Sequence, residues 1–195
     1  MITIADSGGY NIYSIQVALD RLGKKSQLTS DPKAIAQATH LIIPGVGHAG
    51  AAIDKIRKGE FEKSILDRTK PTLGICVGMQ LLFSESEESE KRLLNLIPGR
   101  VKKLNAPGLS VPHMGWNSLE ILSPQCPLLN GLKGGEYVYY VHSFAAPIGA
   151  GTMASTNYAE DFSAVVQRDL FFGVQFHPEK SSRVGELILR NFIEL

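Results

Sequence analysis

Short apolar runs alternate with longer amphipathic runs through the first half of the chain. In residues 10–23 the apolar positions recur at helical spacing, and this stretch stops at Gly23, a residue type common at helix C-termini. Asp31 and Pro32 stand where a helix cap and a first helical residue are expected. Strands that alternate with helices in this way predict parallel pairing and a sheet covered on both faces. The predicted strands are 2–5, 25–28, 40–45 and 71–75, and the predicted helices are 10–23, 31–38, 49–59 and one that begins at residue 77.

The spacing of apolar positions along the chain changes after about residue 97. The segments become short, β-rich and separated by Gly, Pro or Asn, which predicts a more antiparallel strand set that continues the first sheet or packs on it. Near the end, Val184, Leu187, Ile188 and Phe192 are close to helical spacing, so a closing helix is expected on the core. We therefore predict a single domain over residues 1–195, of the α/β class, with a mixed, mostly parallel sheet flanked by helices. The later predicted strands lie in 99–104, 117–122, 136–144, 152–158, 163–169 and 170–176.

Composition and charge narrow the range of partners. Apolar residues make up 44% of the 195 residues and charged residues 20%, which is typical of a soluble globular protein. The formal net charge of +1 gives no overall attraction to nucleic acid or to an anionic membrane. The two cysteines, the lack of a signal-peptide pattern and the lack of an apolar run near the ~18 residues of a membrane helix predict a cytoplasmic protein. The acidic run 84–92 is expected to be a solvated helix end or loop.

The run GICVG at residues 74–78 stands where a predicted strand changes into a predicted helix. A tight turn there brings the backbone on the two sides of Cys76 close together, and Gly74 and Gly78 relieve the crowding. The N-terminus of the following helix favours a thiolate, and the amide of Val77 is expected to face an oxyanion formed by attack of that thiolate. The alternative is that Cys76 is a buried structural cysteine, as we expect for Cys126, which matches no functional motif.

A cysteine nucleophile needs a base, and the segment FHPEK at 176–180 offers one. Proline disfavours helical geometry in the residue before it, so His177 is expected to be extended and to project on the same side as Glu179. The carboxylate then orients the imidazole. A surface turn explains this short motif equally well, but together with Cys76 it favours a Cys–His–Glu triad.

A second oxyanion donor is expected in the segment PGVG at 44–47, because glycines directly after a buried strand allow an amide to face a pocket. The amide of Val46 or Gly47 is the candidate. The chain has neither a phosphate-binding loop pattern nor cysteines and histidines at metal-ligand spacing, so we predict no cofactor and no metal.

The segments PGVG, GICVG and FHPEK, in this order along the chain, resemble those of the class I, triad-type glutamine amidotransferases, and the resemblance covers nearly the whole chain. Two further motifs, PHMGWN (112–117) and YYVHSF (139–144), together with the longer run FHPEKSS (176–182), are similar to the branch of the family that serves histidine biosynthesis. The resemblance implies that Cys76 attacks the side-chain amide of glutamine, that His177 is the acid and base, and that Glu179 orients it.

The resemblance also implies contacts outside the triad. Gln80 is expected to contact the substrate glutamine, and Ser143 and Phe144 are expected to bind its amino-acid end through backbone groups. Ammonia is expected to pass to a cyclase subunit with a (β/α)₈ barrel fold, and glutaminase activity to stay weak until that cyclase and its ligand are present. The expected interface residues are Asn11, Trp116 and Lys180.

Three other functions remain open from the sequence. The chain could be the glutaminase of pyridoxal phosphate, anthranilate or guanylate synthesis, although PHMGWN argues against each. It could be a catalytically silent binding subunit with the same fold, or a cysteine hydrolase of peptides or esters that needs no partner.

Overall fold

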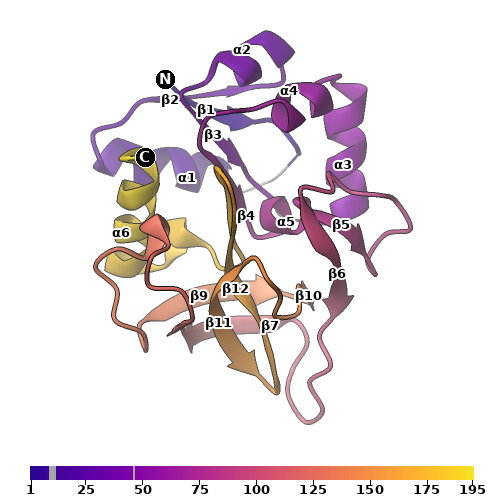
Figure 1. Ribbon diagram of the computed structural model, residues 1–195, viewed down its shortest axis with the longest axis vertical. Helices are drawn as coiled ribbons and strands as arrows, with labels where there is room; N and C mark the ends of the chain where they lie inside the picture. The colour runs from indigo at the N-terminus through magenta and orange to yellow at the C-terminus, as the bar shows by residue number, and fades with distance from the viewer. Residues whose placement is uncertain (9–11, 46) are drawn as a thin grey trace.

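The centre of the molecule is an eight-stranded sheet, described by a computed structural model that covers residues 1–8, 12–45 and 47–195 (Figure 1). Its strands are β1 (Ile2–Ala5), β2 (Ser26–Thr29), β3 (His40–Ile43), β4 (Thr72–Ile75), β8 (Glu120–Ile121), β11 (Thr152–Tyr158), β12 (Glu160–Arg168) and β13 (Phe171–Val174). They are ordered β2-β1-β3-β4-β13-β12-β11-β8. The first five positions in this order pair in parallel, as the alternating pattern predicts.

The remaining pairs, β13–β12, β12–β11 and β11–β8, are antiparallel. The second strand set therefore continues the first sheet, which was one of the two predicted arrangements. Two small sheets lie beside it, with the orders β10-β6-β5 and β7-β9. Their strands are β5 (Phe83–Ser86), β6 (Ile97–Lys103), β7 (His113–Ser118), β9 (Tyr137–His142) and β10 (Phe144–Ala145).

Helices cover both faces of the parallel part of the sheet. Figure 1 shows α1 (Ile12–Arg21) and α6 (Ser182–Ile193) on one side, with α3 (Ala49–Lys58) on the other. The Asp31 side chain caps α2 by accepting a hydrogen bond from the amide of Lys33 at 3.1 Å, as predicted. The other helices are α2 (Pro32–Gln37), α4 (Glu62–Leu66), α5 (Val77–Gln80) and the 3₁₀ helices η1 (Pro127–Leu129) and η2 (Pro178–Lys180).

The helix that begins at residue 77 is shorter than the sequence suggests. It ends at Gln80, and the apolar residues after it enter β5, which pairs in parallel with β6. The carbonyl of Leu82 accepts hydrogen bonds from the amides of Leu96 and Ile97, so non-local pairing replaces the next helical turn. Helix α4, with five residues, was not predicted, because so short a segment has little periodicity to detect.

The buried face of α6 also differs slightly from the predicted one. Gly185, Ile188, Leu189 and Phe192 are buried, whereas Val184 and Leu187 are half-buried at its margin. A Cβ on Gly185 would lie 1.9 Å from the carbonyl oxygen of Pro178. The helix therefore presses directly against η2, and this contact holds the segment after His177 in place.

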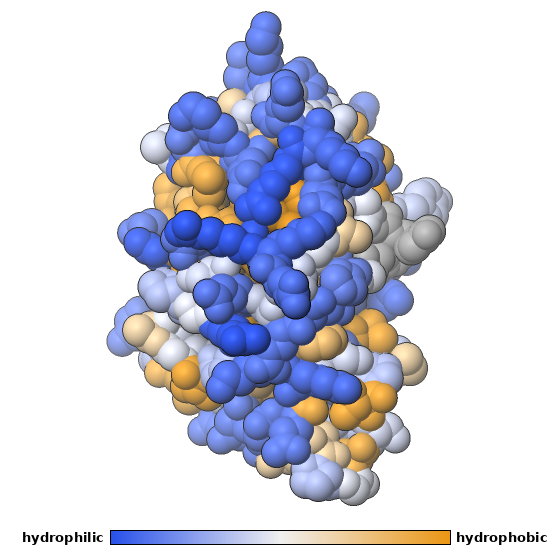
Figure 2. Space-filling view, turned by 90° about the vertical axis from the view of Figure 1, so that its right-hand side faces the viewer, coloured by the Kyte–Doolittle hydropathy of each residue, from blue (hydrophilic) through white to orange (hydrophobic). Residues whose placement is uncertain are grey.

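The buried apolar side chains form one connected cluster from Ile2 to Phe192. By contrast, Figure 2 shows that the side of the molecule carrying α3 and β5 is mainly hydrophilic. Among the described residues, no helix combines the length and the apolar character needed to cross a bilayer.

Candidate active site

The carboxyl ends of three adjacent parallel strands, β3, β4 and β13, meet at one edge of the sheet. Cys76 follows β4 directly and is the residue before α5. Its φ of +53° lies in the left-handed region that non-glycine residues rarely occupy, as expected for a sharp strand-to-helix elbow.

Backbone crowding explains the glycines around this elbow. A Cβ on Gly74 would lie 2.4 Å from the carbonyl oxygen of Gly78, and a Cβ on Gly78 would lie 1.8 Å from that of Ile43. Gly45, in the segment after β3, is equally confined, since its Cβ would lie 2.2 Å from the amide nitrogen of Gly78. A larger residue at Gly74 would push β4 and α5 apart, and one at Gly45 or Gly78 would separate the end of β3 from the elbow.

The thiol of Cys76 is buried, with 3% of the residue exposed, and has polar neighbours. Its Sγ atom lies 3.7 Å from Nε2 of Gln175 and 3.9 Å from the carbonyl oxygen of Val141. A buried cysteine was the structural alternative to a nucleophile, and burial by itself does not separate the two. The polar surroundings favour the nucleophile, because a packing cysteine has no need of them.

Cys126 is different. It is 2% exposed within the apolar core, and burial raises the pKa of its thiol although the backbone of Leu128 and Leu129 interacts with it. The structure thus agrees with a packing role for Cys126.

His177 and Glu179 form a buried pair, with Nδ1 of His177 2.8 Å from Oε1 of Glu179. His177 has extended φ and ψ angles, as predicted. However, Pro178, Glu179 and Lys180 form the 3₁₀ helix η2, so the two side chains meet across a tight turn and not along an extended strand. The prediction of a shared side was right, but its geometric reason was wrong.

Burial would by itself lower the pKa of His177, but its interactions with Cys76 and Glu179 outweigh this effect and raise the pKa to about 10. Nδ1 is occupied by Glu179, so Nε2 is the ring atom that can exchange a proton. This atom is buried and makes no hydrogen bond of ordinary length to any described residue. The arrangement therefore favours a protonated imidazole at His177, next to the sulfur of Cys76.

A small cavity of about 160 Å³ opens beside the thiol. It brings together six of the residues selected from the sequence, which come from separate segments of the chain. The lining residues are Gly47, Cys76, Val77, Gln80, Glu88, Val141, His142, Ser143 and Phe144.

The predicted oxyanion donors are only partly in place. The amide of Val77 donates a 3.4 Å hydrogen bond to the carbonyl oxygen of Gly45, so it is not turned entirely toward the cavity. Gly47 has a φ of +99° and lines the cavity. Val46 lies outside the described residues.

The predicted substrate-binding residues are tied to one another by hydrogen bonds. Nε2 of Gln80 donates to the carbonyl oxygen of Phe144 at 2.8 Å and to Oε1 of Gln175 at 3.1 Å. The same Phe144 carbonyl lies 2.9 Å from Nδ1 of His142. The Ser143 carbonyl accepts from the amide of Leu104, which fixes the chain on the other side of the cavity.

Two of the three predicted interface residues lie close together, away from this cavity. Trp116 on β7 is 52% exposed, and its ring centroid is 6.0 Å from that of Tyr139 on β9. Nζ of Lys180 lies 5.8 Å from the centre of the Tyr139 ring, a cation–π distance. Asn11 lies outside the described residues.

Four residues at the site were not selected from the sequence. Val141 and His142 line the cavity next to the selected Ser143 and Phe144. Glu88 belongs to the acidic run that we expected to be only solvated, yet it lines the cavity and its Oε2 accepts a 2.6 Å hydrogen bond from the amide of Ala49. No local pattern marks it, because its position depends on the turn after β5 folding back onto α3. Gln175, beside the thiol, was detectable, since it lies two residues before His177 at the end of a predicted strand.

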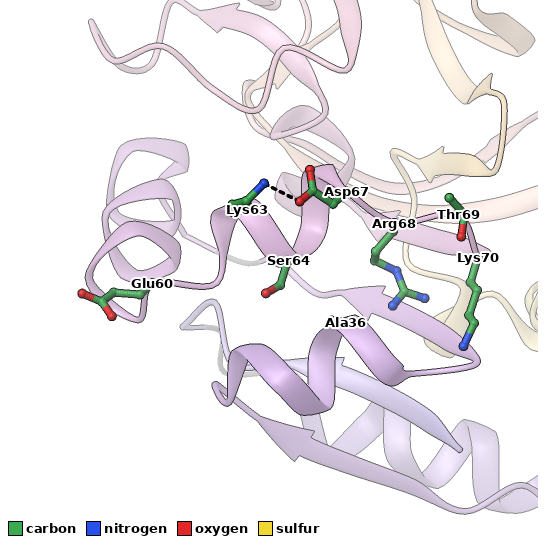
Figure 3. A pocket seen from close by; sticks show the side chains of 8 residues that line it. All are labelled: Ala36, Glu60, Lys63, Ser64, Asp67, Arg68, Thr69 and Lys70. Atoms are coloured by element: carbon green, nitrogen blue, oxygen red, sulfur yellow. Dashed lines mark hydrogen bonds and ion pairs between the residues drawn. The ribbon is translucent and has the colours of Figure 1, made fainter.

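A larger cavity, of about 330 Å³, lies between α2 and α4 (Figure 3). Its Arg68 guanidinium donates to the Thr72 hydroxyl and to backbone carbonyls, and burial lowers the pKa of Arg68 to about 10. Lys63 is paired with Asp67. None of the predicted site residues lines this cavity, and no group of three potential metal ligands is found among the described residues.

Comparisons with known proteins agree with this geometry. Residues 3–195 match the family model of the class-I glutamine amidotransferases. The chain is 44% identical over 197 residues to the imidazole glycerol phosphate synthase subunit HisH of Escherichia coli K12, covering 100% of this chain and 99% of the other. It is 42% identical over 193 residues to the subunit of the same name from Haemophilus influenzae Rd, covering 99% and 96%.

Solved structures show the same fold at lower identity. A glutamine amidotransferase crystal structure superposes with a TM-score of 0.77 at 20% identity, covering 99% of this chain and 97% of the other. A putative GMP synthase protein from Thermoplasma acidophilum gives 0.76 at 22% identity, covering 99% and 92%. With the elbow, the fold and a family match over nearly its whole length, the chain belongs to the class-I glutamine amidotransferases.

Proposed function

We propose that this protein is the glutaminase subunit of imidazole glycerol phosphate synthase in histidine biosynthesis. It hydrolyses L-glutamine to glutamate and ammonia, and a cyclase subunit uses the ammonia to make imidazole glycerol phosphate and an aminoimidazole carboxamide ribonucleotide. The observation that carries the chemistry is Cys76 at a strained elbow beside the buried His177–Glu179 pair. The identity to named subunits over at least 96% of both chains supports the pathway.

The reaction begins with attack of the Cys76 thiolate on the side-chain amide carbon of glutamine. A tetrahedral intermediate forms, and its oxyanion is stabilised by amides of Val77 and of the Val46–Gly47 segment. His177 donates its Nε2 proton to the amide nitrogen, the C–N bond breaks, and ammonia leaves. Cys76 is then bound to the glutamyl group as a thioester.

Water completes the cycle. His177, now neutral, takes a proton from a water molecule at Nε2, and the hydroxide attacks the thioester. The C–S bond breaks, glutamate leaves, and the thiolate and imidazolium are restored. Glu179 holds Nδ1 throughout, so that Nε2 stays directed toward the reaction.

Glutamine itself brings an ammonium and a carboxylate that the cavity must bind. Glu88 supplies a carboxylate for the ammonium at the cavity wall. Gln80 and the backbone of Ser143 and Phe144 contact the rest of the amino-acid end. The small volume of about 160 Å³ suits an amino acid and not a peptide segment, which favours glutamine over the substrates of a general cysteine hydrolase.

The barrel-fold cyclase subunit docks on the surface formed by Trp116, Tyr139 and Lys180, and the two subunits form a heterodimer. The exposed indole and the lysine over an aromatic ring are suited to an interface. Asn11 is proposed to lie in the same interface. We also propose a cytoplasmic location and a single domain over residues 1–195, the latter supported by the one connected core.

Weak activity of the free subunit follows from the state of the oxyanion donors. The Val77 amide is engaged with Gly45, so the segment after β3 must reorient before that amide is fully available. Binding of the cyclase and of its ligand supplies that reorientation. If the isolated chain hydrolyses glutamine at the full rate of the complex, this gating proposal fails.

The Cys76→Ala substitution tests the proposed function. In the complex with the cyclase subunit it should abolish glutamine-dependent synthesis of imidazole glycerol phosphate and spare synthesis from added ammonium, because the cyclase site is on a separate chain. The measurement is product formation with each nitrogen source, with the Cys126→Ala variant as the matched control. Loss of both activities would contradict the proposed division of labour.

A catalytically silent subunit with this fold is the second candidate, and one reagent separates it from an enzyme. Diazo-oxo-norleucine, a glutamine-like electrophile, should label Cys76 in the assembled complex. No adduct there would favour the silent subunit.

A further inference from the structure

We propose that Gln175 is a further catalytic residue, whose side-chain amide donates a hydrogen bond to the sulfur of Cys76 and stabilises the thiolate. The proposal rests on the function proposed above. It adds a neutral donor to the nucleophile, distinct from the charged partner His177.

The position of Gln175 is fixed by the sheet. It directly follows β13, it is 0% exposed, and its backbone amide donates to the carbonyl oxygen of Ala164 at 2.9 Å. Because β13 and β4 run in parallel with Val174 beside Ile75, the residues that follow them, Gln175 and Cys76, emerge at the same edge. Nε2 of Gln175 lies 3.7 Å from Sγ.

The hydrogen-bond network decides which end of the Gln175 amide faces the sulfur. A carbonyl oxygen can only accept, so the NH₂ group of Gln80 must be the end that faces Phe144. The same NH₂ group faces Gln175, which therefore presents its oxygen to Gln80. Its NH₂ group is left to point at Cys76, and the reverse orientation would set two NH₂ groups against each other.

A second set of hydrogen bonds fixes the Phe144 carbonyl on which this orientation depends. His142 is buried and its pKa is lowered to about 3, mainly by burial, so it is neutral at pH 7. Its Nδ1 must carry the proton donated to the Phe144 carbonyl, and its Nε2 accepts from Nδ1 of His113 at 3.1 Å. Nε2 of His113 faces the side-chain amide of Asn117 at 3.5 Å.

Hydrogen bonds thus run without a break from Asn117 on β7, the strand that carries Trp116, to the Phe144 carbonyl. From there Gln80 and Gln175 continue the connection to Cys76. The Phe144 carbonyl therefore accepts hydrogen bonds from His142 on one side and from Gln80 on the other. With both donors in place, the side-chain amides of Gln80 and Gln175 have one consistent orientation.

A donor at this place serves both halves of the reaction. The thiolate is the attacking group in the first half and the leaving group when the thioester hydrolyses. His177 must give up its proton between these steps, whereas an amide does not ionise and keeps its N–H throughout. A hydrogen bond to a charged sulfur in a buried site is stronger than one to a neutral thiol, so it favours the thiolate.

The test is the pH dependence of alkylation of Cys76 by iodoacetamide in the free chain, with peptide mapping to separate Cys76 from Cys126. The charged and titratable groups around the sulfur are His177 and Glu179 from the segment after β13, Glu88 from the turn after β5, and His142 from β9. All remain in each variant, so a change between variants reports on Gln175.

Gln175→Leu should raise the midpoint of the alkylation profile by about one pH unit, equal to about a tenfold loss of rate below the midpoint. Gln175→Glu keeps the shape of the side chain and the acceptor for Gln80, but sets a carboxylate oxygen against the sulfur. It should raise the midpoint further than Leu does. Gln167→Leu, a half-buried glutamine on β12, is the matched control and should leave the profile unchanged.

The order of the two variants separates catalysis from packing. If Gln175 only fills space, the isosteric Glu variant should resemble the wild type and Leu should be the more disturbed, which would overturn the proposal. Unshifted midpoints in both variants would overturn it as well. Because alkylation needs neither glutamine nor a partner, shifted midpoints in a chain that fails to hydrolyse glutamine even in the complex with the cyclase subunit would reject the proposed function and leave the role of Gln175 standing.

Discussion

The charged and reactive side chains around the cavity have separate roles in the proposed reaction. In the proposed reaction Cys76 and His177 are the reacting pair, and Glu179 accepts a hydrogen bond from the imidazole on the opposite side of the ring. Glu88 is the acidic side chain of the cavity wall, and it comes from the turn after β5, apart in the sequence from the triad segments. A second negative charge near a thiolate is unfavourable unless a cation comes with the substrate, and the ammonium of an amino acid is such a cation.

The substitution Glu88→Gln tests this at the scale of one residue. The glutamine variant keeps an oxygen for the amide of Ala49 and removes only the charge. We expect the KM for glutamine to rise about tenfold with a smaller change in kcat, because a charge-assisted hydrogen bond to the bound substrate is lost. The measurement is steady-state glutaminase kinetics in the assembled complex.

Glu90→Gln is the matched control, since Glu90 lies two residues away and does not line the cavity. An unchanged KM in the Glu88 variant would remove Glu88 from substrate binding.

Among the helices and strands, the parallel strands are better predicted from the sequence than the helices and turns that connect them. The elbow at Cys76 was predictable from the local sequence, because the tight turn leaves no room for side chains at Gly74 and Gly78. The end of α5 at Gln80 was not, because pairing of β5 with residues near Ile97 decides it. The pair His177 and Glu179 was predicted for the wrong reason, since η2 turns the chain where an extended segment was expected.

The two-stranded sheet of β7 and β9 contains a pair of histidines that periodicity does not reveal. His113 is stacked between Tyr140 and Tyr158, with ring centroids at 4.9 and 3.9 Å, and is bonded to His142. Burial lowers the pKa of His113 to about 4 and is the main cause that lowers the pKa of His142 to about 3. Both are therefore neutral under ordinary conditions and act as fixed hydrogen-bonding groups.

The acid stability of this element follows from the direction of these shifts. The unfolded chain binds protons on histidine near pH 6.5, but the folded state resists protonation until about pH 4 at His113. Stability contributed by the neutral form is thus present above pH 6.5 and is lost as the pH falls toward 4, by up to about 1.4 kcal/mol per pH unit for each histidine. His113→Phe keeps a ring between the tyrosines and removes one titrating group.

We expect His113→Phe to be less stable than the wild type at pH 7, because Nε2 of His142 loses its donor, but to lose stability less steeply between pH 6.5 and 4. Denaturant unfolding at several pH values in this range measures the slopes. Parallel curves for the two proteins would show that His113 does not titrate in this way.

At the scale of the whole molecule, the sheet sets the triad and the proposed partner surface on adjoining sides of the same segments. The amide of His177 donates to the carbonyl oxygen of Tyr139, and the ring of Tyr139 contacts both Trp116 and Lys180. A partner that moves this aromatic surface would therefore act on β9, whose Tyr139 carbonyl binds the amide of the proposed catalytic histidine, His177. At the cavity between α2 and α4, by contrast, Lys63 pairs with Asp67, and Arg68 donates to the carbonyls of Ile35 and Ala38.

The role of Lys180 can be tested on this scale, because its side chain is exposed and contributes little to the core. Lys180→Ala should weaken association with the cyclase subunit, or lower the stimulation of glutaminase activity by it, and leave the stability of the free chain within about 0.5 kcal/mol of the wild type. Calorimetric titration of the two subunits, glutamine hydrolysis with and without the cyclase, and thermal unfolding of the free chain measure these effects. Lys63→Ala is the matched control, because Lys63 is exposed and paired with Asp67 at the α4 cavity. If Lys180→Ala matches Lys63→Ala in both affinity and stimulation, Lys180 does not belong to the interface, and the path from the partner to His177 must begin elsewhere on β7 or β9.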